Sequence, residues 1–204
     1  TGLGHLDVHA IATSGANIFA GTLGGVFFSN NNGVSWKPVN NGLAVTGIQS
    51  LAINGSTVFA GTSEFGGGVF MSTNNGTSWK GVNISSSSER TVWSIAALGN
   101  TIFAGTNTGM YISTDNGINW TTVRNGLPGK DIQSVIISGE NIFAGTLNGI
   151  YFSTNEGQDW AVITQIHKPK STKTQFITLP QGKAVVIDAN RGCLTITKVT
   201  GGNA

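Results

Sequence analysis

The sequence predicts an all-β fold built from four repeated units, and three observations support this prediction. First, a Ser-x-Asx-x-Gly-x-x-Trp motif occurs four times, with its Trp residues 43, 41 and 40 positions apart. Second, an apolar residue followed by Phe-Ala-Gly-Thr precedes each copy. Third, charged residues make up only 10% of the chain, whereas Gly contributes 30 of its 204 residues. A repeat of about 41 residues indicates stacked supersecondary units, and the turn-rich composition favours short strands.

Each unit divides into four short segments with the residue composition of strands. In the third unit these segments are 92–97, 102–106, 110–114 and 120–123. They are rich in Val, Ile, Phe, Tyr and Thr, and Gly or Asn residues separate them, which is typical of strands rather than helices. Gly99-Asn100 favours a tight hairpin between the first two. We therefore expect four antiparallel strands per unit, which is the anatomy of a propeller blade.

The predicted fold is an all-β propeller of four-stranded antiparallel blades. Residues 1–164 hold four blades, at about 7–39, 47–83, 91–123 and 131–163. The repeat stops after this point, and 165–204 contains three strand-like segments at 175–179, 184–188 and 194–199. We expect this tail to form an irregular fifth blade that residues 1–6 complete. The alternative is that the four blades belong to a larger propeller and that the tail caps it.

The Trp-ending motif predicts a turn that its own side chains hold in place. An Asx side chain accepts hydrogen bonds from backbone amides ahead of it, and Gly adopts backbone angles that other residues resist. The Trp then returns the chain to the core with a large apolar area. We interpret the Asx and Trp residues as structural. They are Asn31 and Trp36, Asn74 and Trp79, Asp115 and Trp120, and Asn155 and Trp160.

This motif resembles the Asp box, or bacterial neuraminidase repeat, and the resemblance covers about residues 8–163. Asp boxes occur in sialidases, xyloglucan-cleaving endoglucanases, sortilin-type receptors and the photosystem II stability factor. The resemblance implies a β-propeller in which the box lies on the outside of each blade, away from the ligand. Asn replaces Asp in three of the four boxes here, which keeps the turn chemistry but weakens any idea of a cation at the box. We also expect an exported protein, extracellular or periplasmic.

One position of the first strand varies between the units, and it is the candidate ligand site. In propellers this strand lines the central channel, and the channel rim is the usual binding surface. The varying residues are His9, Gln49, Trp93 and Gln133. Gln offers hydrogen bonds to sugar hydroxyls, and Trp offers a flat face that can stack on a sugar ring. The alternative is that these side chains only fill the channel. Two loop residues, Phe65 and Arg90, are further candidate contacts.

The residues that an Asp-box enzyme would need are sparse. A sialidase requires an arginine triad, but Arg90, Arg124 and Arg191 fall in a linker, at a blade end and in the tail. A glycosidase requires two carboxylates at a set separation. Asp7 and Asp131, which precede matching first strands, are the one pair that fits a shared site. We therefore expect no catalytic residues.

Other classes of ligand are also disfavoured. His5 and His9 would lie about 13 Å apart along a strand, too far to share a metal ion. No phosphate-binding Gly loop precedes a helix, so we expect no cofactor. The tail carries six cations against one acidic residue, but its cations are not interleaved with aromatic residues as in nucleic-acid binders. The chain has no run of about 20 apolar residues, so we expect no membrane span. Cys193 is the single cysteine and forms no intrachain disulfide.

The sequence thus favours a non-catalytic, secreted binding module that recognises a glycan at the channel rim. The first alternative is a protein-interaction or assembly scaffold. The second alternative is a glycoside hydrolase or a fragment of one. Propeller folds serve all three classes, so the fold by itself does not choose between them. The oligomeric state stays open.

Overall fold

The computed structural model describes residues 2–63, 67–82, 84 and 91–163, together with the backbone of three strands in the tail. Blade one contains β1 (Val8–Ser14), β2 (Asn17–Thr22), β3 (Gly25–Ser29) and β4 (Lys37–Pro38). Blade two contains β5 (Ile48–Asn54), β6 (Thr57–Thr62), β7 (Val69–Ser72) and β8 (Lys80–Val82). Blade three contains β9 (Val92–Leu98), β10 (Thr101–Thr106), β11 (Gly109–Ser113) and β12 (Thr121–Val123). Blade four contains β13 (Ile132–Ser138), β14 (Asn141–Thr146), β15 (Gly149–Ser153) and β16 (Ala161–Val162).

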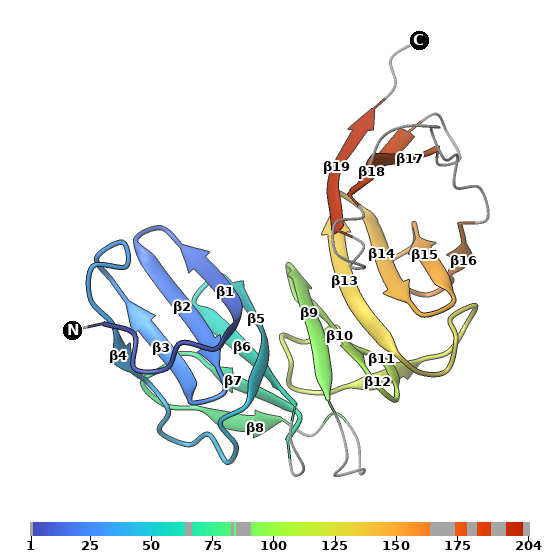
Figure 1. Ribbon diagram of the computed structural model, residues 1–204. Helices are drawn as coiled ribbons and strands as arrows, with labels where there is room; N and C mark the ends of the chain where they lie inside the picture. The colour runs from blue at the N-terminus through green and yellow to red at the C-terminus, as the bar shows by residue number, and fades with distance from the viewer. Residues whose placement is uncertain are drawn as a thin grey trace.

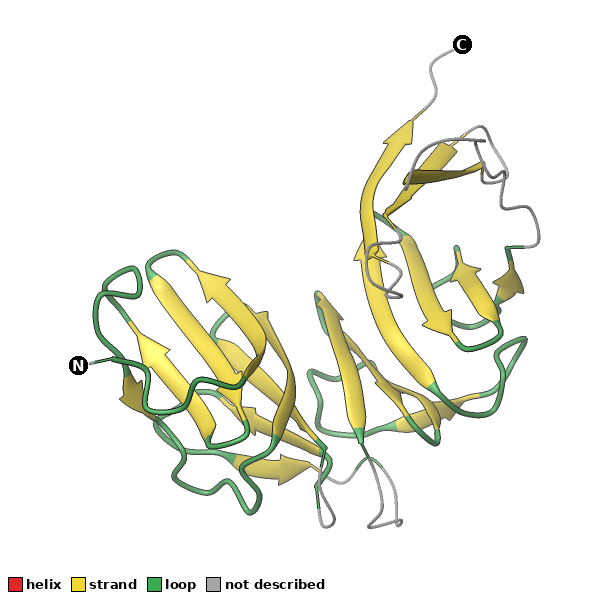
Figure 2. Cartoon of the chain, viewed as in Figure 1, coloured by secondary structure: helices red, strands yellow, loops and turns green. Residues whose placement is uncertain are grey.

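The four blades are antiparallel sheets whose strands pair in chain order, as predicted. They follow one another along an open arc, with β1, β9 and β13 toward its middle and β4, β12 and β16 on its outside (Figure 1). The first strands pack side by side, β1 on β5, β5 on β9 and β9 on β13. Strands joined by loops make up the whole of the described chain (Figure 2). In that part of the chain, no helix is long and apolar enough to cross a bilayer.

The tail contains β17 (Thr174–Thr178), β18 (Lys183–Asp188) and β19 (Thr195–Gly201). These strands form an antiparallel sheet of their own, in the order β17-β18-β19. Residues 2–7 run without strand structure ahead of β1. Completion of a fifth blade by residues 1–6 therefore stays a prediction.

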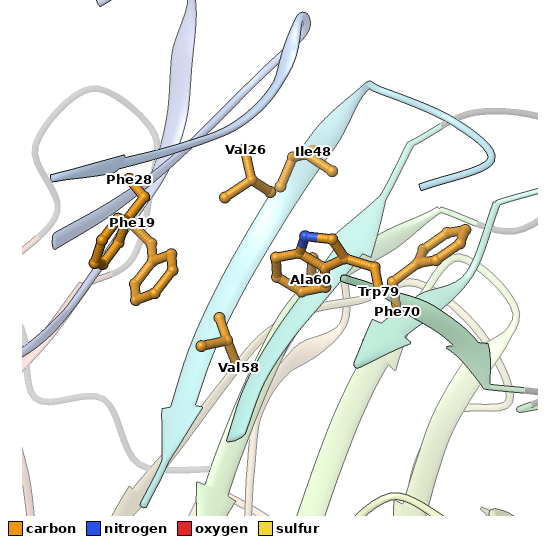
Figure 3. Close-up of a cluster of buried hydrophobic side chains, with 8 residues drawn as sticks. All are labelled: Phe19, Val26, Phe28, Ile48, Val58, Ala60, Phe70 and Trp79. Carbon is orange, nitrogen blue, oxygen red and sulfur yellow. The ribbon is translucent and has the colours of Figure 1, made fainter. Parts of the chain in front are cut away.

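The hydrophobic core lies between the blades rather than inside any one of them. One cluster joins Phe19, Val26 and Phe28 of blade one to residues of blade two (Figure 3). Its blade-two members are Ile48, Val58, Ala60, Phe70 and Trp79. Similar clusters join blade two to blade three and blade three to blade four. Because each blade buries its faces against its neighbours, the blades stabilise one another in sequence, as expected for stacked repeats.

The Phe-Ala-Gly-Thr run of the second strand makes this packing possible. Its Phe is at most 1% exposed in all four blades. The ring lies against the Gly of the next blade's Asp box, so that a Cβ on Gly117 would meet Phe59 at 2.6 Å and one on Gly157 would meet Phe103 at 2.7 Å. The run's own Gly lets the next first strand approach, since a Cβ on Gly21 would meet Ile48 at 2.5 Å. Larger residues at these glycines would push the blades apart.

Each Asp box is a turn closed by the same hydrogen bonds, as the sequence predicts. The Ser hydroxyl accepts a bond from the Gly amide and donates one to the Asx side chain, both at 2.8–2.9 Å. The Asx oxygen also accepts the backbone N–H four residues later, at 2.8–3.0 Å. The residue before Gly has a positive φ of 54–58°, and Gly itself has a φ of 78–84°. This second positive angle explains the Gly.

The seventh residue of each box complements the third. Where the third residue is Asn, its amide donates to an oxygen, on Ser35, Ser78 or Asp159, at 2.8–2.9 Å. Where the third residue is Asp115, the amide of Asn119 donates to its carboxylate at 2.7 Å. Hydrogen bonds from the Asn119 backbone N–H, the Asn119 side-chain amide and the Ser113 hydroxyl lower the pKa of Asp115 to about 2. The Asn-for-Asp changes noted in the sequence therefore keep the hydrogen bonds of the turn without a charge at the third position.

Two of the links between blades share the sequence Asn-Gly-Leu and use it in the same way. Gly42 (φ +89°) and Gly126 (φ +78°) lie so close to the carbonyl oxygens of Trp79 and Trp160 that a Cβ would overlap them. The Trp79 amide also donates to the Asn41 carbonyl at 2.8 Å. Each link therefore fastens one blade to the Asp-box Trp of the next.

Candidate functional site

The varying position of the first strand is a β-bulge in all four blades. In blade one, Val8 pairs with Thr22 and Ala10 pairs with Gly21, which leaves His9 without a partner across the ladder. The same break skips Gln49, Trp93 and Gln133 in the other blades. A bulge inserts an unpaired residue and re-aims its side chain. The four residues that vary in sequence are therefore also the four that the backbone turns out of the regular ladder.

Burial changes sharply at the bulge. The preceding residues Ile48, Val92 and Ile132 are 0% exposed. By contrast, Trp93 is 38% exposed, His9 and Gln133 are exposed, and Gln49 is half-buried. Successive side chains of a strand point to opposite faces of the sheet. The change from a buried residue to a more exposed one at the bulge follows this alternation. The structure thus presents these side chains to solvent at the start of each first strand.

Serines next to the bulges connect neighbouring blades. The Ser50 hydroxyl donates to the Val92 carbonyl at 3.0 Å. The Ser94 oxygen accepts the Val135 N–H at 3.0 Å, and its hydroxyl lies 3.3 Å from the Val135 carbonyl. Blade one has Ala10 at this position, and its side chain has no polar group to bond. These bonds hold the bulges of blades two, three and four at fixed positions relative to one another.

The turns between second and third strands lie at the same end of the blades as the bulges. Thr22 at the end of β2 faces Val8 across the ladder, so the turn that follows Thr22 is beside His9. A buried Thr hydroxyl closes each such turn onto a Gly carbonyl, at 2.9 Å in blade one. The turns carry Leu23, 41% exposed, and Leu147, 71% exposed. We call the four bulged residues and these turns the rim.

The charged groups near the rim do not form a paired site. The Asp7 carboxylate lies 3.5 Å from Nε2 of His9, within blade one. Asp131 lies before β13, where its φ is +59° and its amide donates to the Asn107 carbonyl at 3.2 Å. The strands β5 and β9 lie between β1 and β13 in the row of first strands, so Asp7 and Asp131 belong to blades that are not neighbours in the described chain. Within the described ranges, His, Cys, Asp and Glu form no group of three or more that could hold a metal ion.

Other candidate residues fall elsewhere. Phe65, Arg90 and Arg191 lie outside the described residues. Tyr111 and Tyr151 pair with the Ala of the neighbouring strand in the same register, so they occupy equivalent places in blades three and four.

The sequence did not reveal a groove at the opposite end of the blades. It lies between blades three and four, has a volume of about 540 Å³ and is lined by Leu98, Ile137, Glu140 and Glu156 among others. Leu98 is 54% exposed, although its matching residues are Ser14, Asn54 and Ser138. This one apolar residue among polar counterparts is the feature of the sequence that could have indicated the groove. The groove has the size of a small-molecule pocket, although it is open to solvent.

The repeated sheets, Asp boxes and bulged first strands define this chain as a β-propeller protein. Residues 25–142 match the model of the DUF6242 beta propeller domain, and the chain belongs to this family. The comparison with curated protein sequences gives no match.

Several solved structures are similar in fold. An ancestral GH74 enzyme is 20% identical, with a TM-score of 0.66 over 91% of this chain and 28% of that one. The extracellular domain of the putative one component system BT4673 from B. thetaiotaomicron is 18% identical, with a TM-score of 0.66 over 88% of this chain and 26% of that one. A structure of YCF48 bound to D1 peptide is 16% identical, with a TM-score of 0.65 over 94% and 67%. The chain thus spans little more than a quarter of the first two proteins.

Proposed function

We propose that this chain is a non-catalytic binding module that takes a glycan at the rim. One observation carries the proposal: the position that varies between blades is a bulge in every blade. A fixed framework around a changing, outward-turned side chain suits a binding surface built from repeats. Neighbours in fold include enzymes, a sensor domain and a peptide-binding protein, so the proposal depends on the rim itself.

The chemistry of the four side chains favours a carbohydrate. Trp93 offers a partly exposed ring that can stack on a sugar face. Gln49 and Gln133 each carry two amide donors and a carbonyl acceptor, which match sugar hydroxyls. Among the described residues of the rim, His9 and Asp7 form the one ion pair, so this surface suits a neutral ligand better than a strongly charged one. Export from the cytoplasm is part of the proposal and rests on the resemblance to Asp-box proteins.

The test is a glycan array followed by titration calorimetry on any glycan that binds. Trp93→Ala and Gln133→Ala should each weaken binding at least about tenfold, since each removes a direct contact. Gln158→Ala is the matched control, because Gln158 is an exposed Gln at the other end of the blades, and it should leave affinity unchanged. A glycan whose affinity is the same for all three variants would place the site elsewhere. A blank array with folded protein would reject the carbohydrate proposal.

A second candidate function is peptide binding at the same rim. The observation that favours it is the pair of exposed leucines at the rim turns, Leu23 and Leu147. Exposed apolar surface, where it is contiguous, can mark a protein-interaction site. YCF48, a neighbour in fold, has been solved with the D1 peptide. Leu147→Asp would then abolish capture of a partner protein while leaving any glycan binding intact, and the opposite result would favour the glycan.

A further inference from the structure

The groove between blades three and four lies at the Asp-box end, apart from the rim, and much of its lining is apolar. Leu98, the last residue of β9, is 54% exposed there, and Ile137 near the end of β13 is half-buried. Phe103 and Ile142, both buried, also line the groove. Its volume of about 540 Å³ lies within the range of about 300–1,000 Å³ that small-molecule sites occupy. The groove therefore has room for one small ligand.

An asparagine network occupies the equivalent place between blades two and three. The Asn54 amide, at the end of β5, donates to the Gly99 carbonyl of blade three and to the Asn116 side-chain oxygen, the latter at 3.3 Å. The Asn116 amide donates in turn to the Asn100 side-chain oxygen at 3.2 Å. The described residues that line the hollow at this place include no charged side chain. The polar side chains of this interface thus bond to one another across the two blades.

Blades three and four replace all three asparagines with residues that cannot repeat the network. Leu98 stands where blade two has its bridging asparagine, so blade three offers no amide to blade four. Glu140 and Glu156 stand where blade three has its other two asparagines, and both are exposed in the groove. Ionised carboxylates carry no N–H to donate to each other, and as like charges they repel. This interface therefore exchanges internal hydrogen bonds for an apolar wall and two negative charges.

The described chain supplies no positive charge to pair with these carboxylates. Its one ion pair joins His9 to Asp7 at the other end of the blades. Arg124 lines a neighbouring hollow that also reaches Glu156, but the two form no ion pair. Opposite charges attract and apolar surfaces pack together, so a positively charged group on an apolar body would complement both parts of the groove.

We propose that this groove binds a small organic cation, an amine or guanidinium carried on an apolar chain or ring. Its cationic group would pair with Glu140 and Glu156, and its apolar part would pack against Leu98 and Ile137. A small molecule fits better than a long protein segment, because the groove has the size of one ligand and its described lining belongs to two neighbouring blades only. This site is separate from the glycan site proposed at the rim, and the failure of one would leave the other standing.

The first test compares three probes that share an apolar body and differ in charge: phenylbutylamine, phenylbutanol and phenylbutyrate. Each is titrated to about 5 mM into the isotope-labelled full chain, because ligands of this size bind weakly. We expect the amine to shift the backbone amide signals of Leu98, Glu140 and Glu156 in a saturable way. The alcohol should bind at least about threefold more weakly, and the carboxylate should not bind. The signals of Trp93 and Gln133 at the rim should stay in place.

Charge-neutral variants test the two carboxylates. Glu140→Gln and Glu156→Gln should each raise the dissociation constant of phenylbutylamine about two- to fivefold, and together about tenfold, because each removes an exposed ion pair at nearly constant size. Asp131→Asn is the matched control. It removes a carboxylate from the same blade, just before β13 rather than at its far end, and Asn tolerates the φ of +59° there. It should leave the dissociation constant unchanged.

A further variant tests the apolar wall. Leu98→Asn gives blade three the residue that blade two has at this place, and it should weaken binding of phenylbutylamine at least about threefold because an apolar contact is lost. Circular dichroism checks that each variant is folded.

Four outcomes would overturn the proposal. One is a folded protein whose groove signals do not respond to the amine, and another is equal binding of the three probes. A third is a loss of affinity from Asp131→Asn as large as that from Glu140→Gln, which would mean that the attraction comes from the overall charge. The fourth is a response of the groove signals to a short lysine-containing peptide but not to phenylbutylamine, which would make the occupant a protein segment.

Discussion

The four repeats are alike in their side-chain hydrogen bonds at one end of the blades and differ in their side chains at the other end. At the Asp-box end, four turns share the same hydrogen bonds, and differences in one side chain are matched by differences in its partner. At the rim end, four bulges share the same backbone, but their side chains are His, Gln, Trp and Gln. The Asp-box side chains bond to their own turn, whereas three of the four bulged rim residues are exposed and the fourth, Gln49, is half-buried. The comparison indicates that one end holds the fold together and that the other is free to vary.

The largest loss of stability is expected at Gly126, where the link between blades three and four contacts Trp160 of an Asp box. Gly126→Ala should lower the free energy of unfolding by about 3 kcal/mol, because the methyl group would overlap the Trp160 carbonyl at a left-handed backbone angle. Urea unfolding measures this. Gly139→Ala is the control: its φ is +61°, but nothing lies within 4 Å of a Cβ there, so it should cost only about 1 kcal/mol. Equal losses would show that the link does not fasten the blades.

A smaller effect tests the complementarity inside one box. Asn155→Asp would set two carboxylates at the position where the Asn155 amide now donates to Asp159 at 2.9 Å. We expect a loss of about 1–2 kcal/mol at neutral pH from the lost hydrogen bond and the like charges. The exchange Asn155→Asp with Asp159→Asn reproduces the arrangement of Asp115 and Asn119, and should recover most of this loss in urea unfolding. Failure of the exchange to recover stability would contradict the pairing rule.

The pH dependence of stability tests the one box that carries a charge at its third position. Backbone and side-chain hydrogen bonds from Asn119 lower the pKa of Asp115 from 3.8 to about 2. The folded state therefore binds the proton less readily than the unfolded chain. The stability that Asp115 contributes is complete above about pH 4 and is lost as the pH falls toward 2. In the Asp115→Asn variant, the urea concentration at the midpoint of unfolding should change less between about pH 4 and pH 2 than in the unmodified protein. An unchanged dependence on pH would argue against the lowered pKa.

A smaller change still is expected at the residue before the box Gly. Glu156 adopts a φ of +58°, whereas the other three boxes place Asn there. Asn tolerates the left-handed region better than Glu, so Glu156→Asn should raise the free energy of unfolding by about 0.5 kcal/mol. Asn75→Glu, at the matching exposed position in blade two, should lower it by a similar amount. The thermal midpoints of both variants measure these changes, and a change of the opposite sign in either variant would contradict the prediction.

The smallest effect on stability is expected at the rim. Gln133→Ala should leave the free energy of unfolding within about 0.5 kcal/mol, because Gln133 is exposed and unpaired across the ladder. A loss above about 1 kcal/mol in urea would mean that the bulge depends on its side chain. The contrast between the two ends would then be weaker than the structure indicates.

Much of the fold follows from local sequence patterns. The Asp-box turns, their positive φ angles and the four-stranded units depend on residues within about 40 positions of one another, so a single repeat contains the information. The predicted third-unit segments differ from the observed strands by one residue at several ends. Comparison of the repeats also identified the varying rim position. It did not reveal the bulge, because a register break depends on how two strands pair and not on either strand alone.

The contacts between blades were beyond the sequence patterns. That the Gly of one blade must be small because Ile48 or Val92 approaches it is visible only when two blades are placed together. The same holds for the groove around Leu98. The sequence by itself determined the repeat, the strands and the turn chemistry, because these are short-range properties. Tertiary structure alone decided which repeated residues are buried between blades and which stay exposed, because burial depends on the neighbouring blade.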